Sequence, residues 1–237
     1  MMENEKTTIA SNQPYLIPTY FIDSDSEIVS DFASDAIGET KDPIEKAVAL
    51  FFAVRDKIRY DPYRISLEKK DMTASSTIQR SHGFCVTKAI VLAAVARSVG
   101  IPACPGFANV KNHLNSPRLQ TLMKTDIFIY HGYTEFYLLG KWVKATPAFN
   151  IELCERAGLF PLDFDGKSDS LFHAYNRKGD KYMEYLVDHG SFQDLPYETI
   201  MKEYALHYPH WLTMEKLQSG RITDNIRFEE EVEKKYE

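Results

Sequence analysis

The apolar positions of the chain follow several distinct patterns. Between residues 44 and 59 they recur near the spacing of an α-helix. Asp42 supplies a side-chain acceptor at the N-cap, Pro43 fits the first helical position, and Glu45 stands where it can satisfy a free amide. We predict a helix here that ends before Pro62, because a proline disfavours helical geometry in the residue before it.

The run from Ala89 to Ala96 is apolar nearly all round and has no polar face. It predicts a second helix over about Cys85–Val99, with Gly100 and Pro102 as its stop signals. A helix of this kind is expected to lie at the centre of the core.

A third pattern is the alternation from Ile127 to Tyr137, which is typical of a strand. A short turn at residues 139–141 leads to a second run at Trp142–Thr146, which Pro147 ends. We predict an antiparallel hairpin. Together with the two helices, it indicates an α+β fold.

The remaining segments carry weaker signals. Residues 104–126 and 150–195 are interpreted as loops, and residues 196–206 as a helix. The first 15 or so residues are expected to be loosely ordered, and residues 227–237 to form a charged, solvated tail. Residues 16–237 are predicted to form a single domain.

Composition excludes several function classes. The chain has 28 Lys and Arg against 34 Asp and Glu, and no dense basic cluster that could neutralise several phosphates, so a nucleic-acid partner is not expected. No apolar stretch reaches the roughly 18 residues of a membrane helix, and the start of the chain lacks the features of a secretory signal. Three scattered cysteines predict neither disulfides nor a metal site, so we expect a cytoplasmic protein without metal or organic cofactor.

The candidate chemistry rests on Cys85 and His131. Cys85 begins the predicted central helix, and His131 lies in the alternating strand. The positive end of a helix and a nearby imidazolium both favour a thiolate and lower the pKa of a thiol. A lone cysteine is more often a small buried hydrophobe, but a histidine supplied from elsewhere in the fold favours a nucleophile and its base. We therefore predict a cysteine nucleophile.

Several weak motifs in one order resemble the transglutaminase-like superfamily, whose members share the papain-like fold. The chain carries an Ile-x-Tyr helix end, a Gly-Phe-Cys nucleophile motif, an Arg-x-x-Gly-Ile-Pro-Ala helix end, a histidine strand and a Trp-Val-x-x-x-Pro strand, at Ile58–Tyr60, Gly83–Cys85, Arg97–Ala103, His131–Tyr137 and Trp142–Pro147. The resemblance covers roughly residues 45–150. It implies a nucleophile helix that packs against an antiparallel β-sheet, with helices N-terminal to it.

The resemblance also implies an oxyanion hole, which stabilises the charge that develops on a carbonyl oxygen during acyl transfer. The Cys85 backbone amide is one candidate donor. Gln79 is a second, because papain-like peptidases place a glutamine at a similar offset before the nucleophile. A glutamine in such a polar stretch can equally be an ordinary loop residue.

One position departs from the family pattern. Where the family has an Asp that orients the catalytic histidine, this chain has Thr146. A threonine hydroxyl can accept the imidazole N–H but supplies no charge. Three accounts stay open: Thr146 suffices, another side chain such as Asn150, Asp163 or Asp165 reaches His131, or the site binds without turnover.

The expected function is hydrolysis of an amide or peptide bond through a thioester on Cys85, with His131 as the base and a peptide, protein or small amide as substrate. Bacterial-type members of the superfamily resemble hydrolases more than cross-linking enzymes. The alternatives are an impaired peptide-binding module, a protein-glutamine acyltransferase, or an acyl-CoA-dependent acetyltransferase, for which no nucleotide-binding surface is found.

Overall fold

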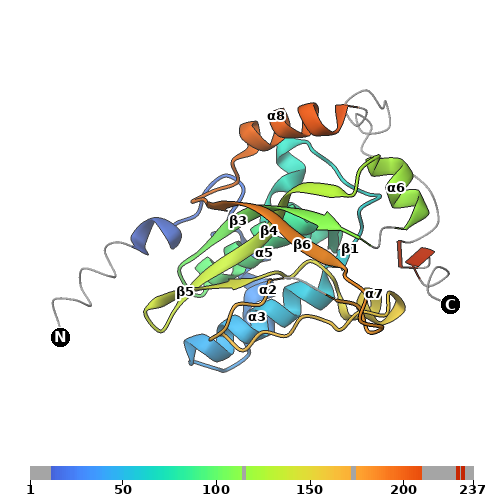
Figure 1. The fold of residues 1–237 in the computed structure, drawn as a ribbon. Coiled ribbons are helices and arrows are strands. Elements are labelled where there is room, and N and C mark those ends of the chain that lie inside the picture. The colour runs from blue at the N-terminus through green and yellow to red at the C-terminus, as the bar shows by residue number, and fades with distance from the viewer. Residues whose placement is uncertain (1–11, 114–115, 172–174, 210–227, 230, 233–237) are drawn as a thin grey trace.

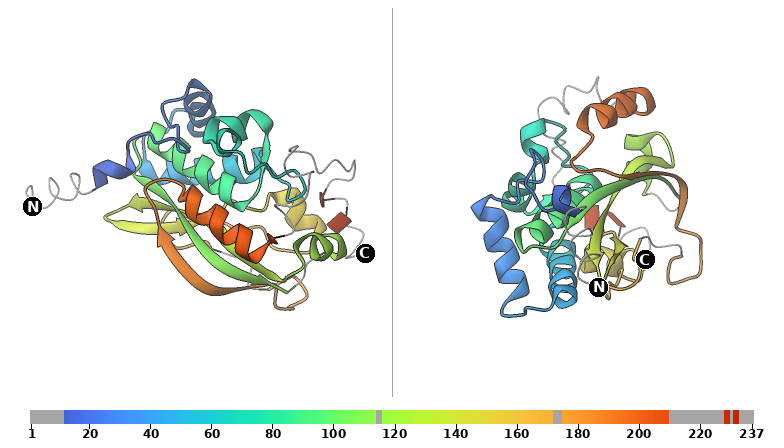
Figure 2. Two further views of the ribbon diagram at one scale, coloured as in Figure 1. Left: turned by 90° about the horizontal axis from the view of Figure 1, so that it is seen from above. Right: turned by 90° about the vertical axis from the view of Figure 1, so that its left-hand side faces the viewer.

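The computed structural model describes residues 12–113, 116–171, 175–209, 228–229 and 231–232. Figure 1 shows a curved antiparallel sheet with helices packed against it, and Figure 2 shows the same arrangement from two further sides. The helical elements are η1 (Gln13–Tyr15), α2 (Glu27–Ile37), α3 (Pro43–Lys57), η2 (Lys69–Met72), α4 (Ala74–Arg80), α5 (Cys85–Ser98), α6 (Pro117–Met123), α7 (Ile151–Arg156) and α8 (Tyr197–His207). This mixture confirms the predicted α+β class.

The main sheet has the strand order β5-β4-β3-β6, and all its neighbours are antiparallel. Its strands are β3 (Ala103–Asn112), β4 (Ile127–Leu138), β5 (Lys141–Ala145) and β6 (Met183–Ser191). Strands β4 and β5 form the predicted hairpin, which is therefore confirmed. Two short strands, β1 (Arg59–Tyr60) and β2 (His82–Gly83), pair in parallel outside this sheet.

Helix α5 is the centre of the molecule, as its apolar sequence predicts. Thirteen of its residues, from Cys85 through Arg97, are buried. The helix contacts β3 and β4 on one side and α2, α3 and α4 on the other. Because α5 is enclosed on all sides, its first residue, Cys85, is held in a fixed place relative to β4.

Helix α3 begins as its sequence predicts. The Asp42 side chain accepts hydrogen bonds from the backbone N–H groups of Ile44 and Glu45, at 2.9 and 3.0 Å. The helix ends at Lys57, somewhat earlier than predicted, because residues 59–60 instead pair with β2. This pairing carries the chain past the start of α5 and brings Tyr60 close to Cys85.

The two segments interpreted as loops contain regular structure, and those interpretations were wrong. Strand β3 and helix α6 lie within or beside residues 104–126, and α7 and β6 lie within residues 150–195. β3 is the inner strand between β4 and β6 and is buried along most of its length, so its sequence lacks the alternation of a half-exposed strand. Periodicity alone misses such a strand.

The expectation of a solvated tail is also wrong for the described residues of that segment. Phe228, Glu229 and Val232 are buried. Phe228 and Val232 are four residues apart, the spacing that places two side chains on one face of a helical turn. Residues 1–11, most of the segment expected to be loosely ordered, lie outside the described part of the chain. Among the described helices, none is long and apolar enough to cross a membrane.

Candidate active site

Cys85 is the first residue of α5, and the residues around it have a tightly fixed backbone. The Phe84 N–H donates to Thr87 Oγ1 at 3.1 Å and so satisfies one of the free amides at the helix start. A Cβ at Gly83 would lie 2.5 Å from the same Thr87 oxygen. The Gly-Phe-Cys sequence therefore fits a tight entry into a buried helix.

The Cys85 sulfur lies among backbone amides. The backbone N–H groups of Gly132, Val86 and Cys85 itself lie near it, and each of them lowers the pKa of the thiol. The amides of Cys85 and Val86 are free because the first N–H groups of a helix lack intrahelical partners. The Gly132 amide comes from β4 and stands next to His131 in the chain. Donors in this arrangement stabilise a thiolate, and equally an oxyanion.

Burial opposes these donors and is the larger influence. Cys85 is only 8% exposed, and loss of solvation raises the pKa of its thiol to about 11. The direction is opposite to the lowered pKa expected from the helix terminus. In the arrangement described, Cys85 is therefore a protected thiol.

Alkylation of Cys85 measures this protection directly. Against an ordinary cysteine with the reference pKa of 9.0, a pKa of about 11 leaves about 100-fold less thiolate near neutral pH. We expect iodoacetamide to modify Cys85 correspondingly slowly at pH 7.5, at a rate that keeps rising beyond pH 9. Intact mass and peptide mapping across pH would record the rate; rapid modification with a midpoint below pH 8 would contradict the closed arrangement.

Strand β4 crosses directly over the start of α5. An ideal Cβ at Gly132 would lie 2.7 Å from the Cys85 carbonyl oxygen and 3.0 Å from Val86 Cα. Tyr130, just before the crossing, has a left-handed φ of 52°, and the pairing of β4 with β3 shifts register nearby. His131 follows, 4% exposed and paired with Ala108. The structure thus brings the His131-Gly132 segment to the nucleophile helix.

A small cavity of about 30 Å³ adjoins Cys85 and has a mainly aromatic and aliphatic wall. Its lining residues come from the β1 region, α5, α6, β4 and α8, and they are Tyr60, Pro62, Ile65, Phe84, Cys85, Leu119, Met123, Phe128, Ile129, Tyr204 and Tyr208. Tyr60 and Phe84 both belong to this wall. Tyr63, Tyr130 and Tyr133 are absent from this wall.

Helix α8 covers the cavity. Tyr208, its C-cap residue, accepts a hydrogen bond from the Ile129 N–H at 2.8 Å and donates to the Ile127 carbonyl at 3.0 Å. Burial raises the pKa of Tyr204 and of Tyr208, and the nearby Cys85 raises both further. The left view of Figure 2 shows α8 lying across the molecule on the side of α5 and the sheet. The thiol is therefore covered by the chain's own C-terminal part.

Comparison with known proteins identifies the family of the chain. Residues 30–147 match the model of the transglutaminase-like superfamily. The chain belongs to the transglutaminase-like superfamily. No curated protein matches it. A solved structure described as "Putative Cysteine Protease from Cytophaga hutchinsonii" is 18% identical, with a TM-score of 0.49, and the match covers 78% of this chain and 47% of that one. This chain thus matches about half the length of that protein.

Thr146, at the position of the family's Asp, directly follows β5. Its N–H donates to the Ser170 carbonyl at 2.8 Å, and its hydroxyl is buried without a hydrogen-bond partner among the described residues. Ala145 just before it pairs with Thr134 of β4, so Thr146 lies beside the strand that carries His131. A buried hydroxyl in this position can still accept a bond.

Asn150 is 3% exposed and already has partners at both ends of its amide. Its Oδ1 accepts from the Tyr60 N–H at 3.2 Å, and its Nδ2 donates to Glu229 Oε1 at 3.1 Å. These bonds tie the segment after β5 to the segment after α3 and to the C-terminal segment. Asn150 therefore holds the backbone of Tyr60, a residue that lines the cavity beside Cys85.

The other sequence candidates lie elsewhere. Gln79 is an exposed residue of α4, and no described contact joins it to Cys85. Asp163 and Asp165 are exposed and line a separate cleft of about 660 Å³ beside Phe52 and Phe164. Asp165 accepts the N–H groups of Lys167 and Ser168 there. The described residues include no group of three or more His, Cys, Asp or Glu placed to hold a metal ion.

Two features of the site have no local sequence signal. The Gly132 amide reaches Cys85 only because β4 crosses the helix start, and the glycine itself indicates only close packing. The sequence predicts α8 as a helix, but it does not predict that Tyr204 and Tyr208 pack over the cavity of Cys85. Tertiary packing decides both.

Proposed function

We propose that the protein is a cysteine hydrolase of amide or peptide bonds, with Cys85 as nucleophile and His131 as general base. The observation that carries the proposal is the close approach of Gly132, the residue next to His131, to the start of α5, where its backbone amide and those of Cys85 and Val86 lower the pKa of the Cys85 thiol. A buried structural cysteine needs no such donors, whereas a thiolate and a developing oxyanion both do.

The reaction would proceed in two halves. His131 takes the thiol proton, and the Cys85 sulfur attacks the carbonyl carbon to form a tetrahedral oxyanion. Collapse of this species breaks the C–N bond, and the amine leaves with the proton from His131. Water then attacks the thioester while His131 accepts its proton, and the carboxylic acid departs as the thiol reforms.

The Cys85 and Val86 amides are the donors best placed for the oxyanion, because they stand at the positive end of α5. Thr146 is the side chain that we assign to orient His131. Its buried hydroxyl is open to accept, while the Asn150 amide is engaged by Tyr60 and Glu229. A neutral hydrogen-bond acceptor such as this hydroxyl fixes the tautomer of the His131 imidazole without adding charge.

A catalytically impaired peptide-binding module is the second candidate. Two observations favour it: Thr146 replaces the family's Asp, and burial holds the pKa of Cys85 high. Transfer of the acyl group to a second amine, in place of water, is the third.

Turnover of a panel of peptide coumarin amides, together with intact-mass detection of an acyl adduct on Cys85, would test the proposal. We expect Cys85→Ser and His131→Ala each to lower the rate by about 1,000-fold or more. The matched control is His113→Ala, a histidine that pairs with Glu184 away from the site. Turnover that survives Cys85→Ser, or a wild-type protein that forms no adduct, would remove the hydrolase. Adduct transfer to an added primary amine would identify the acyltransferase.

A further inference from the structure

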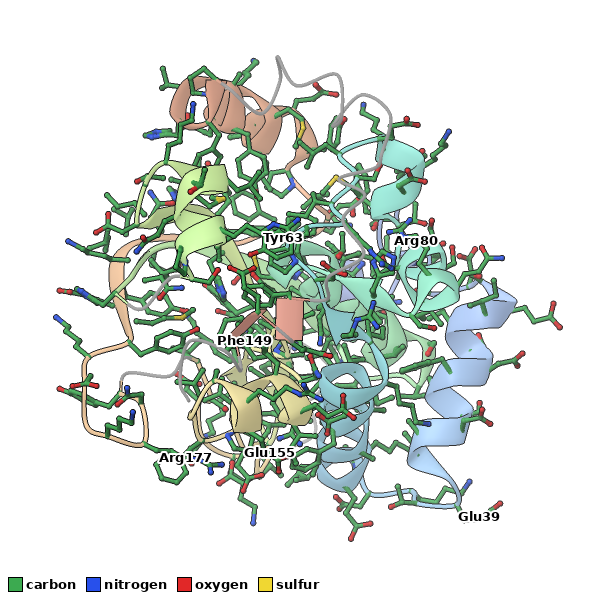
Figure 3. The ribbon with its side chains drawn as sticks, turned by 90° about the vertical axis from the view of Figure 1, so that its right-hand side faces the viewer. Glu39, Tyr63, Arg80, Phe149, Glu155 and Arg177 are labelled. Atoms are coloured by element: carbon green, nitrogen blue, oxygen red, sulfur yellow. The ribbon has the colours of Figure 1, made fainter. Side chains whose placement is uncertain are left out.

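Residues of the C-terminal segment pack against Tyr60, Tyr63, Arg118 and Asn150 beside the candidate active site, and we call this surface the groove. In Figure 3 this short segment, drawn in red, lies between the labelled Tyr63 and Phe149. Phe228 inserts its ring beside Tyr60 and Tyr63, with centroid separations of 5.9 and 5.4 Å, and Val232 is buried one helical turn later. Burial of an aromatic ring between two others is a substantial anchor.

Carboxylates fix the same segment from its polar side. Glu229 is buried and accepts from Asn150 Nδ2 at 3.1 Å. Glu231 accepts from the Tyr63 hydroxyl through Oε2 and from the Arg118 N–H at 3.3 Å through Oε1. The groove therefore presents an aromatic slot with donors on its rim, which suits an aromatic residue followed by acidic ones.

The charge around the groove also suits an acidic peptide. The Arg118 guanidinium lies 4.2 Å from the centroid of the Tyr63 ring. Arg59 and Arg64 share a single carboxylate, Asp61, at 3.6 and 3.5 Å. These arginines are the chain neighbours of Tyr60 and Tyr63, so the segment 59–64 carries two guanidinium groups against one carboxylate, although the whole chain carries a net charge of −6. Such local charge selects acidic ligands.

The groove is continuous with the nucleophile. Tyr60 contacts Phe228 on one side and lines the cavity of Cys85 on the other. The Cys85 thiol is also close enough to raise the pKa of the Tyr60 phenol beyond the increase caused by burial. Asn150, which holds Glu229, also accepts the Tyr60 N–H. A peptide in this groove therefore lies one side chain away from the reacting sulfur.

We infer that this groove is the substrate-binding part of the active site, that it accepts peptide segments with an aromatic residue followed by glutamates, and that residues 228, 229, 231 and 232 occupy it in cis as an autoinhibitory segment. The inference rests on the proposed function only in that it calls the bound peptide a substrate, because peptide binding in the groove itself needs no thiol chemistry. A segment tethered to its own site competes at a high effective concentration, so a peptide in trans binds weakly until the tether is released.

Two substitutions in the 237-residue chain would release the segment. Phe228→Ala removes the aromatic anchor, and Glu231→Gln weakens both polar bonds with little change of volume. The matched controls are Phe160→Ala and Glu155→Gln, which change the same residue types at exposed positions away from the groove. Circular dichroism would verify that each variant folds, and Glu231→Gln is the milder test if Phe228→Ala does not.

The first measurement is alkylation of Cys85 by iodoacetamide at pH 7.5. We expect each groove variant to raise the rate about fivefold or more, since opening increases the competent fraction of the protein, and both controls to keep the wild-type rate. Equal rates in all five proteins would overturn the autoinhibitory role.

The second measurement is fluorescence anisotropy of a labelled peptide with the sequence of residues 225–237, added to the Cys85→Ser protein. We expect the peptide to bind at least about tenfold more tightly to the Cys85→Ser protein that also carries Phe228→Ala and Glu231→Gln than to the protein with Cys85→Ser alone. A peptide with the same two changes should lose binding. Absence of peptide binding to the protein with both substitutions would overturn the proposal that the groove binds peptides.

The two proposals fail separately. Peptide binding and faster alkylation without any turnover would support the groove and remove the hydrolase. Turnover by the wild-type protein, with no peptide binding and no effect of Phe228→Ala, would support the hydrolase and remove the groove.

Discussion

Replacing Gly132 by alanine is expected to disable the site and destabilise the fold together. The added Cβ would stand 2.7 Å from the Cys85 carbonyl oxygen, 3.0 Å from Val86 Cα and 3.1 Å from Ala89 Cβ. These atoms belong to the backbone or to a short side chain, so no rotamer change relieves the contact. Overpacking of this kind costs about 1–3 kcal/mol, and β4 has to move away from α5 to relieve it.

That movement would withdraw the Gly132 amide from the Cys85 sulfur and shift His131, its neighbour. Displacement of catalytic groups by about 1 Å can cost about 100-fold in rate, so turnover should fall by at least that factor. Urea denaturation would measure stability, and the peptide-amide assay would measure turnover. The control is Gly140→Ala, at the β4–β5 turn, where φ is +81° and no atom lies within 4 Å of the added Cβ.

The two glycines separate two causes of damage. Gly140→Ala strains the backbone by about 1 kcal/mol, because alanine is poorly suited to a left-handed φ, but it leaves the site intact. We therefore expect it to lower stability while turnover stays near the wild-type value. If Gly132→Ala folds with wild-type stability and turnover, the close crossing of β4 over α5 is not what positions the pair.

The sequence predicts the elements whose patterns are local. Helix α3 follows from its N-cap and its apolar spacing, α5 from its continuous apolar run, and the β4–β5 hairpin from alternation around a turn. β3 escapes prediction because it is buried on both sides and shows no alternation, and β6 because it is an edge strand with many half-exposed residues. The burial of such strands depends on partners remote in sequence.

The candidate site, like the fold, is predicted from the sequence only in part. Cys85 and His131 carry a recognisable signal, since the first begins a helix and the second lies in a strand of a known family pattern. Their environment does not, because the amide of Gly132, the tyrosines of α8 and the docking of Phe228 depend on packing between distant segments. The helix terminus alone predicts a reactive thiol. The segments that cover Cys85 have the opposite effect, because burial raises the pKa of its thiol.

Lys88 provides the second large effect, on the pH dependence of stability. It lies one turn after Cys85 in α5 and is completely buried. Its Nζ donates to the carbonyls of Arg55, at 2.9 Å, and Ile58, which are unsatisfied groups at the end of α3. Burial lowers the pKa of Lys88 from 10.5 to about 7, although the nearby Asp56 favours the charged form.

The sign of the effect follows from proton binding. Between about pH 7 and pH 10.5 the unfolded chain keeps this lysine protonated while the folded chain does not, so the free energy of unfolding rises with pH in that window. The penalty for burying the charge is fully present below the folded pKa and is relieved as the pH rises through it. From pH 7 to pH 9 this single group should add about 2 kcal/mol to the stability of the wild-type protein.

Lys88→Met removes both the titration and the two hydrogen bonds. We expect the variant to be less stable than the wild type at pH 9, because buried carbonyls without donors each cost about 1–3 kcal/mol, and to approach the wild type toward pH 7. Urea denaturation at several pH values would measure the difference, in which the titrations common to both proteins cancel. The matched control is Lys41→Met, the same substitution at an exposed position. A constant difference for Lys88→Met between pH 7 and pH 9 would mean that Lys88 stays charged in the core, with its ammonium stabilised by the end of α3.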